Sequence, residues 1–188
     1  FNIILLVELG VVFLFSARAY SANIMTLRGM FFLYSALNGL TLTLVSLRYN
    51  VFDVVIPALI GTLAFFIGFA VVGATTKRNL SSLTPYVMAA LFGMIIVSLV
   101  MMGARFFNWT VLSGFSDTVS LVLGYVGVVA FSIFTAIDVN RIKNNVTQVA
   151  LMEDETILDR IEITGALSLY LDFINLFLSL LRIFGNKR

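Results

Sequence analysis

The chain has 188 residues, of which 60% are hydrophobic and only 12% are charged, with a formal net charge of +2. A soluble domain carries about a quarter of its residues charged, so this chain lacks the polar surface that a globule in water needs. The composition predicts a single integral membrane domain over residues 1–188 and argues against a nucleic-acid-binding surface. The absence of Cys and His excludes disulfides, thiolate metal sites and a Cys or Ser–His active site.

Six apolar runs follow one another along the chain, and each is predicted to be a membrane-spanning helix. Most approach the roughly 20 residues that a helix needs to cross a hydrocarbon core about 30 Å thick. The runs are residues 2–17, 29–47, 54–75, 85–103, 118–137 and 163–184. The first run is the shortest and starts without an initiator Met. We therefore expect an all-α polytopic bundle with six visible spans and, in its native form, a seventh span before residue 1.

The basic residues between the runs predict the orientation of the bundle. Gaps two and four contain one basic residue each, Arg48 and Arg105. The odd-numbered gaps contain seven, namely Arg18, Arg28, Lys77, Arg78, Arg141, Lys143 and Arg160. Since Lys and Arg concentrate on the cytoplasmic side, the odd-numbered gaps are predicted to be cytoplasmic. This orientation places the tail residues Lys187 and Arg188 outside, against the same bias.

The fifth gap, residues 140–162, is the only long one. Acidic residues such as Glu153 and Glu162 surround Ile157, Leu158 and Ile161 in this gap. The pattern predicts a short amphipathic helix at the membrane surface, capped by Asp154 or Thr156. Two interpretations remain open, a solvated connector and a surface for regulation or for docking a partner protein.

Polar residues follow one face of the sixth run. They recur at spacings of three and four and are Gly165, Ser168, Asp172, Asn175, Ser179 and Arg182. At 100° per residue these positions form one polar stripe on an otherwise apolar helix. A lipid-facing helix would not carry such a stripe, so we expect it to face other helices or a water-lined cavity. Asn175, Ser168 and Ser179 are therefore candidates for lining a cation path.

Two aspartates are the main candidates for a proton-linked site. Asp138 ends the fifth run, and Asp172 lies deep in the sixth, so their side chains can meet near the cytoplasmic side. Two close carboxylates cannot both ionise cheaply and titrate as a unit. Without His, this pair is the obvious pH sensor. The same oxygens, with Asn175, also suit a hard cation such as Ca²⁺.

The first run supplies charged partners for the sixth. Glu8 and Arg18 are ten residues apart, as are Asp172 and Arg182, which corresponds to a rise of about 15 Å in a helix. Laid antiparallel, the two helices bring Glu8 level with Arg182 and Arg18 toward Asp172. We expect the outer pair to be structural and the inner cluster, which includes Asp138, to act as a gate.

Three segments resemble the transmembrane Bax-inhibitor-motif family. They are residues 166–177 (ALSLYLDFINLF) with 180–185 (LLRIFG), residues 131–143 (FSIFTAIDVNRIK), and residues 73–81 (GATTKRNLS). The likeness covers nearly the whole chain, and the chain looks most similar to bacterial members that resemble a pH-sensitive calcium-leak protein. The resemblance implies a seven-helix bundle in the bacterial inner membrane, with its last helix central and its first helix missing here.

The resemblance also implies roles for individual residues. The family's paired-aspartate sensor corresponds to Asp138 and Asp172, and its outer Glu–Arg pair to Glu8 and Arg182. Its arginine latch corresponds to Arg18, although the stretch after this residue is spaced differently from the family pattern.

The predicted function is a passive, pH-gated Ca²⁺ leak, with no resident cofactor and with Ca²⁺ and protons as its ligands. An alternative is a stress-regulatory membrane protein that binds other membrane proteins, such as a quality-control protease. A proton-coupled transporter is less supported, because no paired Gly- or Pro-broken helices occur. We do not expect an enzyme, since one of the two aspartates, which might suggest an aspartyl protease, sits at a span end.

Overall fold

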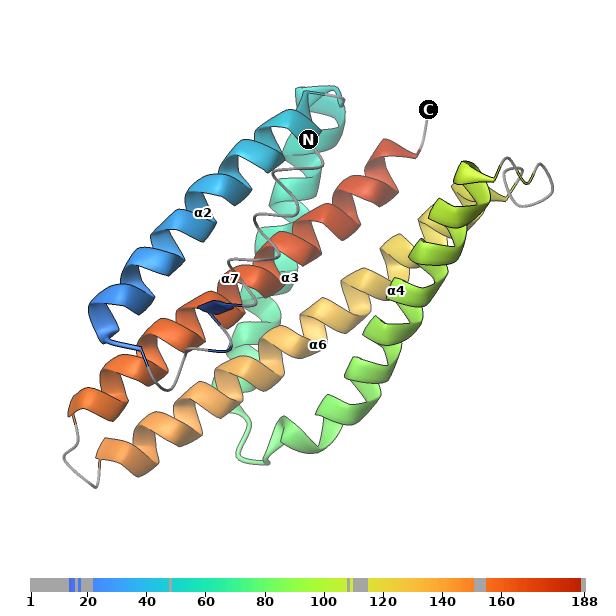
Figure 1. Cartoon of the computed structure of the whole chain (residues 1–188). Coiled ribbons are helices and arrows are strands. Elements are labelled where there is room, and N and C mark those ends of the chain that lie inside the picture. The colour runs from blue at the N-terminus through green and yellow to red at the C-terminus, as the bar shows by residue number, and fades with distance from the viewer. Residues whose placement is uncertain are drawn as a thin grey trace. The chain divides into compact units, whose positions relative to one another are not determined.

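A computed structural model of the chain describes residues 14–15, 17, 22–47, 49–107, 109, 115–150 and 155–186. These residues form helices and connections, and no β-strand occurs among them. The helices are α2 (Ile24–Ser46), α3 (Ile56–Thr75), α4 (Thr84–Phe106), α6 (Ser116–Ala150) and α7 (Glu155–Gly185) (Figure 1). A π-helical turn at Val51–Val55 leads into α3, and a 3₁₀ turn at Leu80–Leu83 leads into α4. The prediction of an all-α fold is confirmed for this part of the chain.

Among the described residues, four helical segments are long and apolar enough to cross a membrane. They are Val51–Thr75, Leu80–Ala104, Ser116–Val149 and Thr156–Gly185, and they coincide with the last four predicted runs. The second run lies in α2, which is not among the four. The first run lies almost entirely outside the described residues. The structure therefore supports four spans, and the predicted counts of six visible and seven native spans are not supported by it.

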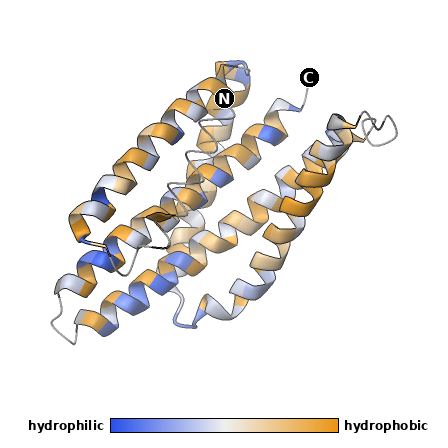
Figure 2. Ribbon diagram, in the orientation of Figure 1, coloured by the Kyte–Doolittle hydropathy of each residue, from blue (hydrophilic) through white to orange (hydrophobic). Residues whose placement is uncertain are grey.

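The predicted short amphipathic helix in the fifth gap is wrong. Residues 140–150 instead continue α6, which is 35 residues long, and residues 155–162 form the start of the 31-residue α7. No Gly or Pro occurs between residues 128 and 164, so nothing in the local sequence interrupts either helix. Figure 2 shows polar residues at these two helix ends, whereas α3 and α4 are mostly hydrophobic. The predicted cap Asp154 lies outside the described residues.

The chain divides into two compact units, each with its own contacts. The first unit comprises Phe1–Val51 and Ile142–Ser168, and the second comprises Phe52–Arg141 and Leu169–Arg188. In the first unit, the Asn23 side chain caps α2 by accepting a hydrogen bond from the Met25 amide at 3.1 Å. Arg28 of the same helix pairs with Asp159 of α7 at 3.6 Å. Both side chains of this ion pair are largely exposed, so its contribution to stability is small.

Glycines set the helix packing in the second unit. On α6, Gly124 lies against Ile183 of α7, and Gly127 lies so close to Ser179 that a Cβ atom there would overlap the serine side chain. These contacts show that α6 and α7 run antiparallel in close contact. Small residues permit such an approach between membrane helices.

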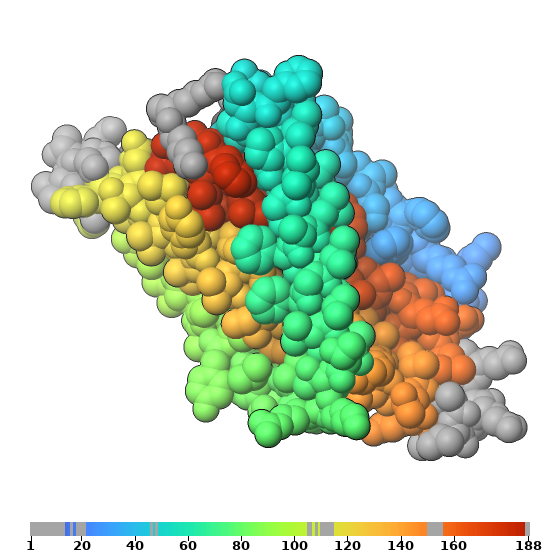
Figure 3. Space-filling model, turned by 180° about the vertical axis from the view of Figure 1, so that it is seen from behind, coloured from blue at the N-terminus to red at the C-terminus, as the bar shows by residue number. Residues whose placement is uncertain are grey.

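Helix α3 crosses both α6 and α7 in the second unit. Gly73 of α3 lies directly on the backbone of Ala136 in α6, and Gly61 faces Leu180 of α7. Figure 3 shows α3 lying across these two helices. On the α4 side, the packing of α4 on α6 centres on Val87, Ala130 and Ile137.

The helices differ in how much of each span is buried. The buried share is 50% for the α7 span and 44% for the α6 span, against 17% and 11% for the spans of α3 and α4. The spans of α6 and α7 are thus the most buried of the four. These two helices also carry the candidate polar residues.

Candidate functional site

The antiparallel packing of α6 and α7 brings Asp138 and Asp172 together. Because Gly124 lies against Ile183 and Gly127 against Ser179, residue 172 falls opposite residues 134–135, about one helical turn from residue 138. The two carboxylates are close enough to repel each other when both are ionised. The two aspartates therefore lie on adjacent helices of the second unit, about one helical turn apart along the helix axes.

Asp172 is the most enclosed charge-bearing side chain of the stripe. It is only 7% exposed, and its Oδ2 atom accepts no hydrogen bond from any residue that the structure describes. A buried polar atom without a partner costs about 1–3 kcal/mol, and more if the group is charged. The buried face of α6 near this level is also polar, with Ser132 and Thr135 both fully buried. The arrangement suits a group that gains or loses a proton or binds a cation.

Asp138 has a counter-charge that the sequence analysis did not name. Its carboxylate lies 3.8 Å from the guanidinium of Arg141, one turn further along α6, and the Asp138 side chain is 13% exposed against 49% for Arg141. The predicted counter-charge Arg18 lies outside the described residues. Arg141 is three residues after Asp138, a spacing that brings two side chains together on one face of a helix. This spacing predicts an ion pair only if the helix continues past the apolar run.

Asn140 is a second residue that the sequence analysis missed. Its side chain is 1% exposed and makes three hydrogen bonds to the connection between α3 and α4. The amide nitrogen donates to the carbonyl oxygens of Gly73 and Thr76 at 3.2 and 3.3 Å, and Oδ1 accepts from the Leu80 amide at 3.1 Å. Asn140 therefore holds this connection to the turn of α6 that carries Asp138 and Arg141.

The polar stripe of α7 lies partly inside the second unit. Asn175 donates to the Leu171 carbonyl at 2.8 Å, and the Ser179 hydroxyl donates to the Asn175 carbonyl at 2.7 Å. With the exposed Arg182, both residues line a cavity of about 450 Å³ between α4, α6 and α7. Ser168 is half-buried and belongs to the first unit. Glu8, the predicted partner of Arg182, lies outside the described residues.

The acidic residues of the site are few for a resident metal ion. Among the residues that the structure describes, no three His, Cys, Asp or Glu side chains cluster in a way that could hold a metal. Ca²⁺ prefers six to eight oxygen ligands. Asp138 and Asp172 can supply only part of such a shell.

Comparison with known proteins identifies the family. The family described as inhibitor of apoptosis-promoting Bax1 matches residues 1–188. The inner membrane protein YbhL of Escherichia coli (strain K12) is 36% identical over 187 residues, which cover 98% of this chain and 74% of that protein.

Two further relatives agree in length and similarity. An uncharacterized protein of Borreliella burgdorferi is 36% identical over 188 residues, covering 100% of this chain and 75% of the relative. An uncharacterized membrane protein of Streptococcus pyogenes serotype M1 is 37% identical over 182 residues, covering 97% and 72%. With four helices that can span a membrane and a family match over its whole length, this chain belongs to the Bax1-inhibitor family and is an integral membrane protein.

Proposed function

We propose that the protein is a passive, pH-sensitive Ca²⁺ leak whose gate is the Asp138–Asp172 pair. The observation that carries this proposal is the buried Asp172 carboxyl, whose Oδ2 atom has no hydrogen-bond partner among the described residues and which lies about one helical turn from the level of Asp138 on the adjacent helix. Ionisable groups inside a membrane are costly and usually mark ion or proton pathways. A structural role would be better served by a satisfied or apolar side chain.

The gate works through the charges on α6 and α7. A proton shared by the two carboxylates, or an arginine bound to them, keeps the helices together. Further protonation releases the arginine, and a small shift of one helix opens a polar path along Asn175 and Ser179. Arg18 remains the proposed latch, and Arg141 is a second candidate because it already contacts Asp138.

The native bundle is proposed to contain more spans than the four described here. Six spans would be visible if the first run and α2 also cross the membrane, and a helix before residue 1 would make seven, with α7 central. The distribution of Lys and Arg supports a cytoplasmic location for the odd-numbered gaps. A relative named as an inner membrane protein supports the bacterial inner membrane as the location.

Calcium efflux from proteoliposomes tests the leak directly. Full-length protein should release trapped Ca²⁺ at a rate that depends on pH, and Asp138→Asn and Asp172→Asn should each change that dependence. Asp117→Asn is a matched control, because Asp117 is an exposed residue at the other end of α6. The proposal fails if wild-type protein releases no Ca²⁺, or if both variants behave like the control.

A second candidate function rests on the length of α6. At 1.5 Å per residue its 35 residues span about 52 Å, well beyond a hydrocarbon core of about 30 Å. The polar end of this helix could bind another membrane protein, as expected of a stress-regulatory partner. Pull-down of membrane proteins separates the two functions. This candidate predicts that replacing residues 145–160 by a neutral linker abolishes binding of the partner. It also predicts that Asp138→Asn leaves that binding unchanged.

A further inference from the structure

The connection between α3 and α4 is a short basic segment between two apolar spans. It contains Lys77 and Arg78, here called the basic pair, and both side chains are exposed. Figure 2 shows this segment as hydrophilic, whereas the helices on either side are mostly hydrophobic. No Asp or Glu occurs between residues 54 and 116, so neither helix supplies an opposite charge of its own. The connection therefore presents two exposed positive charges.

Two observations place the connection at the level of the lipid headgroups. It joins Val51–Thr75 to Leu80–Ala104, which are the two least buried of the four spans, at 17% and 11%. Because these spans face hydrocarbon, the short segment that joins them lies at the membrane surface. Tyr86, in the first turn of α4, is 76% exposed, as expected for an aromatic residue at this interface. The basic pair is therefore within reach of lipid phosphates.

Hydrogen bonds on both sides of the basic pair hold the connection in place. The Asn79 side chain accepts from the Ser81 amide at 2.9 Å and so caps the 3₁₀ turn that follows. Asn140 of α6 donates to the Thr76 carbonyl at 3.3 Å and accepts from the Leu80 amide at 3.1 Å. A ligand of the basic pair therefore binds a segment that is already ordered, and less conformational entropy is lost on binding.

Asn140 also joins this segment to the proposed gate. It lies on the same turn of α6 as Asp138 and Arg141, whose charged groups are 3.8 Å apart. The Asn140 side chain is buried, and close-packed interiors transmit displacements from one element to the next. A ligand that shifts the connection therefore also shifts the turn that carries Asp138.

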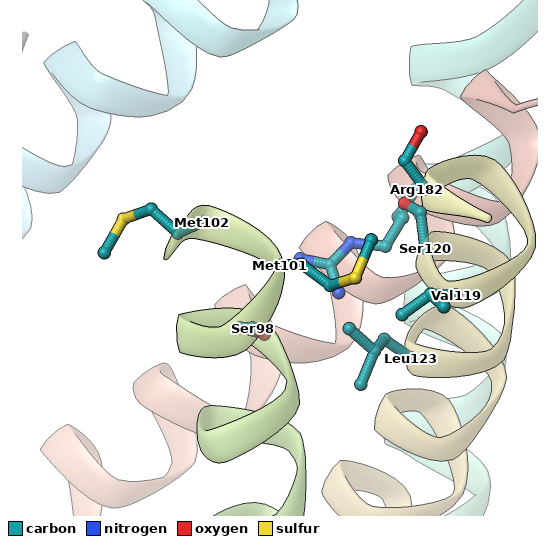
Figure 4. A pocket seen from close by; sticks show the side chains of 8 residues that line it. Ser98, Met101, Met102, Val119, Ser120, Leu123 and Arg182 are labelled. Carbon is teal, nitrogen blue, oxygen red and sulfur yellow. The ribbon is translucent and has the colours of Figure 1, made fainter. Parts of the chain in front are cut away.

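The connection lies at the opposite end of α4 from the cavity in Figure 4. That cavity of about 240 Å³ is lined by Met101 and Met102, near the end of α4, and by Arg182 of α7. At 1.5 Å per residue, about 25 Å of helix separates residue 84 from residue 101. Binding at the basic pair is thus independent of the group that pairs with Arg182.

We propose that the basic pair binds the phosphate of an anionic phospholipid and that Asn140 transmits this binding to the turn of Asp138. The guanidinium of Arg78 offers a planar fork of donors to two phosphate oxygens, and the Lys77 ammonium adds a point charge. Basic segments at a membrane surface attract anionic lipids in this way. Lipid binding follows from the connection alone, whereas a change in gating rests on the proposed function.

Native mass spectrometry of the full-length protein tests the binding, with phosphatidylglycerol and phosphatidylcholine as probes. Wild-type protein should bind phosphatidylglycerol on the order of tenfold more tightly, because each Lys or Arg adds to the attraction of a net negative headgroup. Lys77→Gln combined with Arg78→Gln should remove most of this preference. Lys77→Arg combined with Arg78→Lys keeps both charges and should retain it. Arg28→Gln, at an exposed arginine of α2, is the matched control and should change nothing.

Hydrogen–deuterium exchange in nanodiscs tests the coupling separately from Ca²⁺ movement. Replacing phosphatidylcholine by phosphatidylglycerol should slow exchange at residues 76–80 and at residues 138–141 of wild-type protein. In Asn140→Ala the lipid should still bind, but exchange at residues 138–141 should no longer respond, whereas Asn145→Ala should behave like wild type. If Asn140→Ala fails to fold, the double glutamine variant provides the check, because phosphatidylglycerol should then slow exchange at neither segment.

Equal binding of the two lipids by wild-type protein contradicts the proposal, as does an unchanged preference in the double glutamine variant. Sodium phosphate or polyglutamate that slows exchange as much as phosphatidylglycerol contradicts the lipid assignment and points to free phosphate or to an acidic protein. Lipid binding without slower exchange at residues 138–141 contradicts the coupling. A protein that binds phosphatidylglycerol but releases no Ca²⁺ contradicts the proposed leak and not the lipid site.

Discussion

Asn140 uses both ends of its side-chain amide to hold the connection between α3 and α4. Asp138 and Arg141, which form an ion pair with each other, lie on the same turn of α6 as Asn140. The three hydrogen bonds of Asn140 therefore also hold that turn in place. The Asn140 side chain is 1% exposed and Gly73 is buried as well, so the hydrogen bond between them has no ready replacement by water. Asn140 thus acts as a positioning residue for the proposed gate.

We predict that Asn140→Ala lowers the free energy of unfolding by about 2–4 kcal/mol, because it leaves a buried amide and two carbonyl groups without partners. Hydrogen–deuterium exchange should show faster exchange of the Leu80 amide. Asn145→Ala, at an exposed position on the same helix, serves as the control and should change stability by less than about 0.5 kcal/mol. An equal effect of both substitutions would argue against the role of the Asn140 contacts.

The residues of the site differ in how far they could be predicted. Asp138 and Asp172 were identified because a carboxyl group in an apolar run demands an explanation. Asn140 and Arg141 were not, because the apolar run ends at residue 137 and the helix continues without an apolar signal. The partners of Asn140 lie 60 or more residues away in the sequence, and the partner of Arg141 lies one turn earlier on a helix that continues past the apolar run. Such pairings depend on tertiary contacts and helix boundaries that local patterns do not specify.

At the scale of elements, α3 is positioned by its glycines. Gly73 lies on the backbone of Ala136, whereas Gly68, one to two turns earlier, has no atom within 4 Å of the place where a Cβ would lie. The same residue type therefore has different functions at two positions of one helix. The sequence alone does not separate the two positions.

We predict that Gly73→Ala destabilises the protein by about 1–3 kcal/mol, since the added methyl group would push α3 away from α6. Gly68→Ala is the matched control and should be neutral or stabilising by up to about 1 kcal/mol, because alanine favours the helix. Thermal unfolding of the purified protein measures both. Comparable unfolding temperatures for the two variants would contradict the close packing at Gly73.

Helix boundaries were the least predictable part of the fold. The apolar runs located four spans, because hydropathy reports the length of helix that lies in hydrocarbon. The same signal could not show that α6 and α7 continue into the polar fifth gap, since helix formation there depends on the absence of Gly and Pro. It also predicted a span at residues 29–47, a segment of α2 that is not among the four described spans.

For the whole molecule, the proposed orientation can be tested because the chain contains no cysteine. We predict that a membrane-impermeant maleimide applied to intact cells labels Trp109→Cys, in the fourth gap, and does not label Lys77→Cys, in the third. Both side chains are exposed, so accessibility within the protein should not decide the result. After permeabilisation both variants should react. Labelling of Lys77→Cys alone in intact cells would reverse the orientation.

The proposed gate requires that the buried carboxyl group of Asp172 changes its protonation state. Infrared difference spectroscopy between acidic and alkaline pH measures this most directly, because a protonated carboxyl group has its own C=O band. We expect a pH-dependent band in wild-type protein and in Asp117→Asn that is lost in Asp172→Asn and shifted in Asp138→Asn. A band that persists unchanged in Asp172→Asn, or no carboxyl band at any pH, would contradict it.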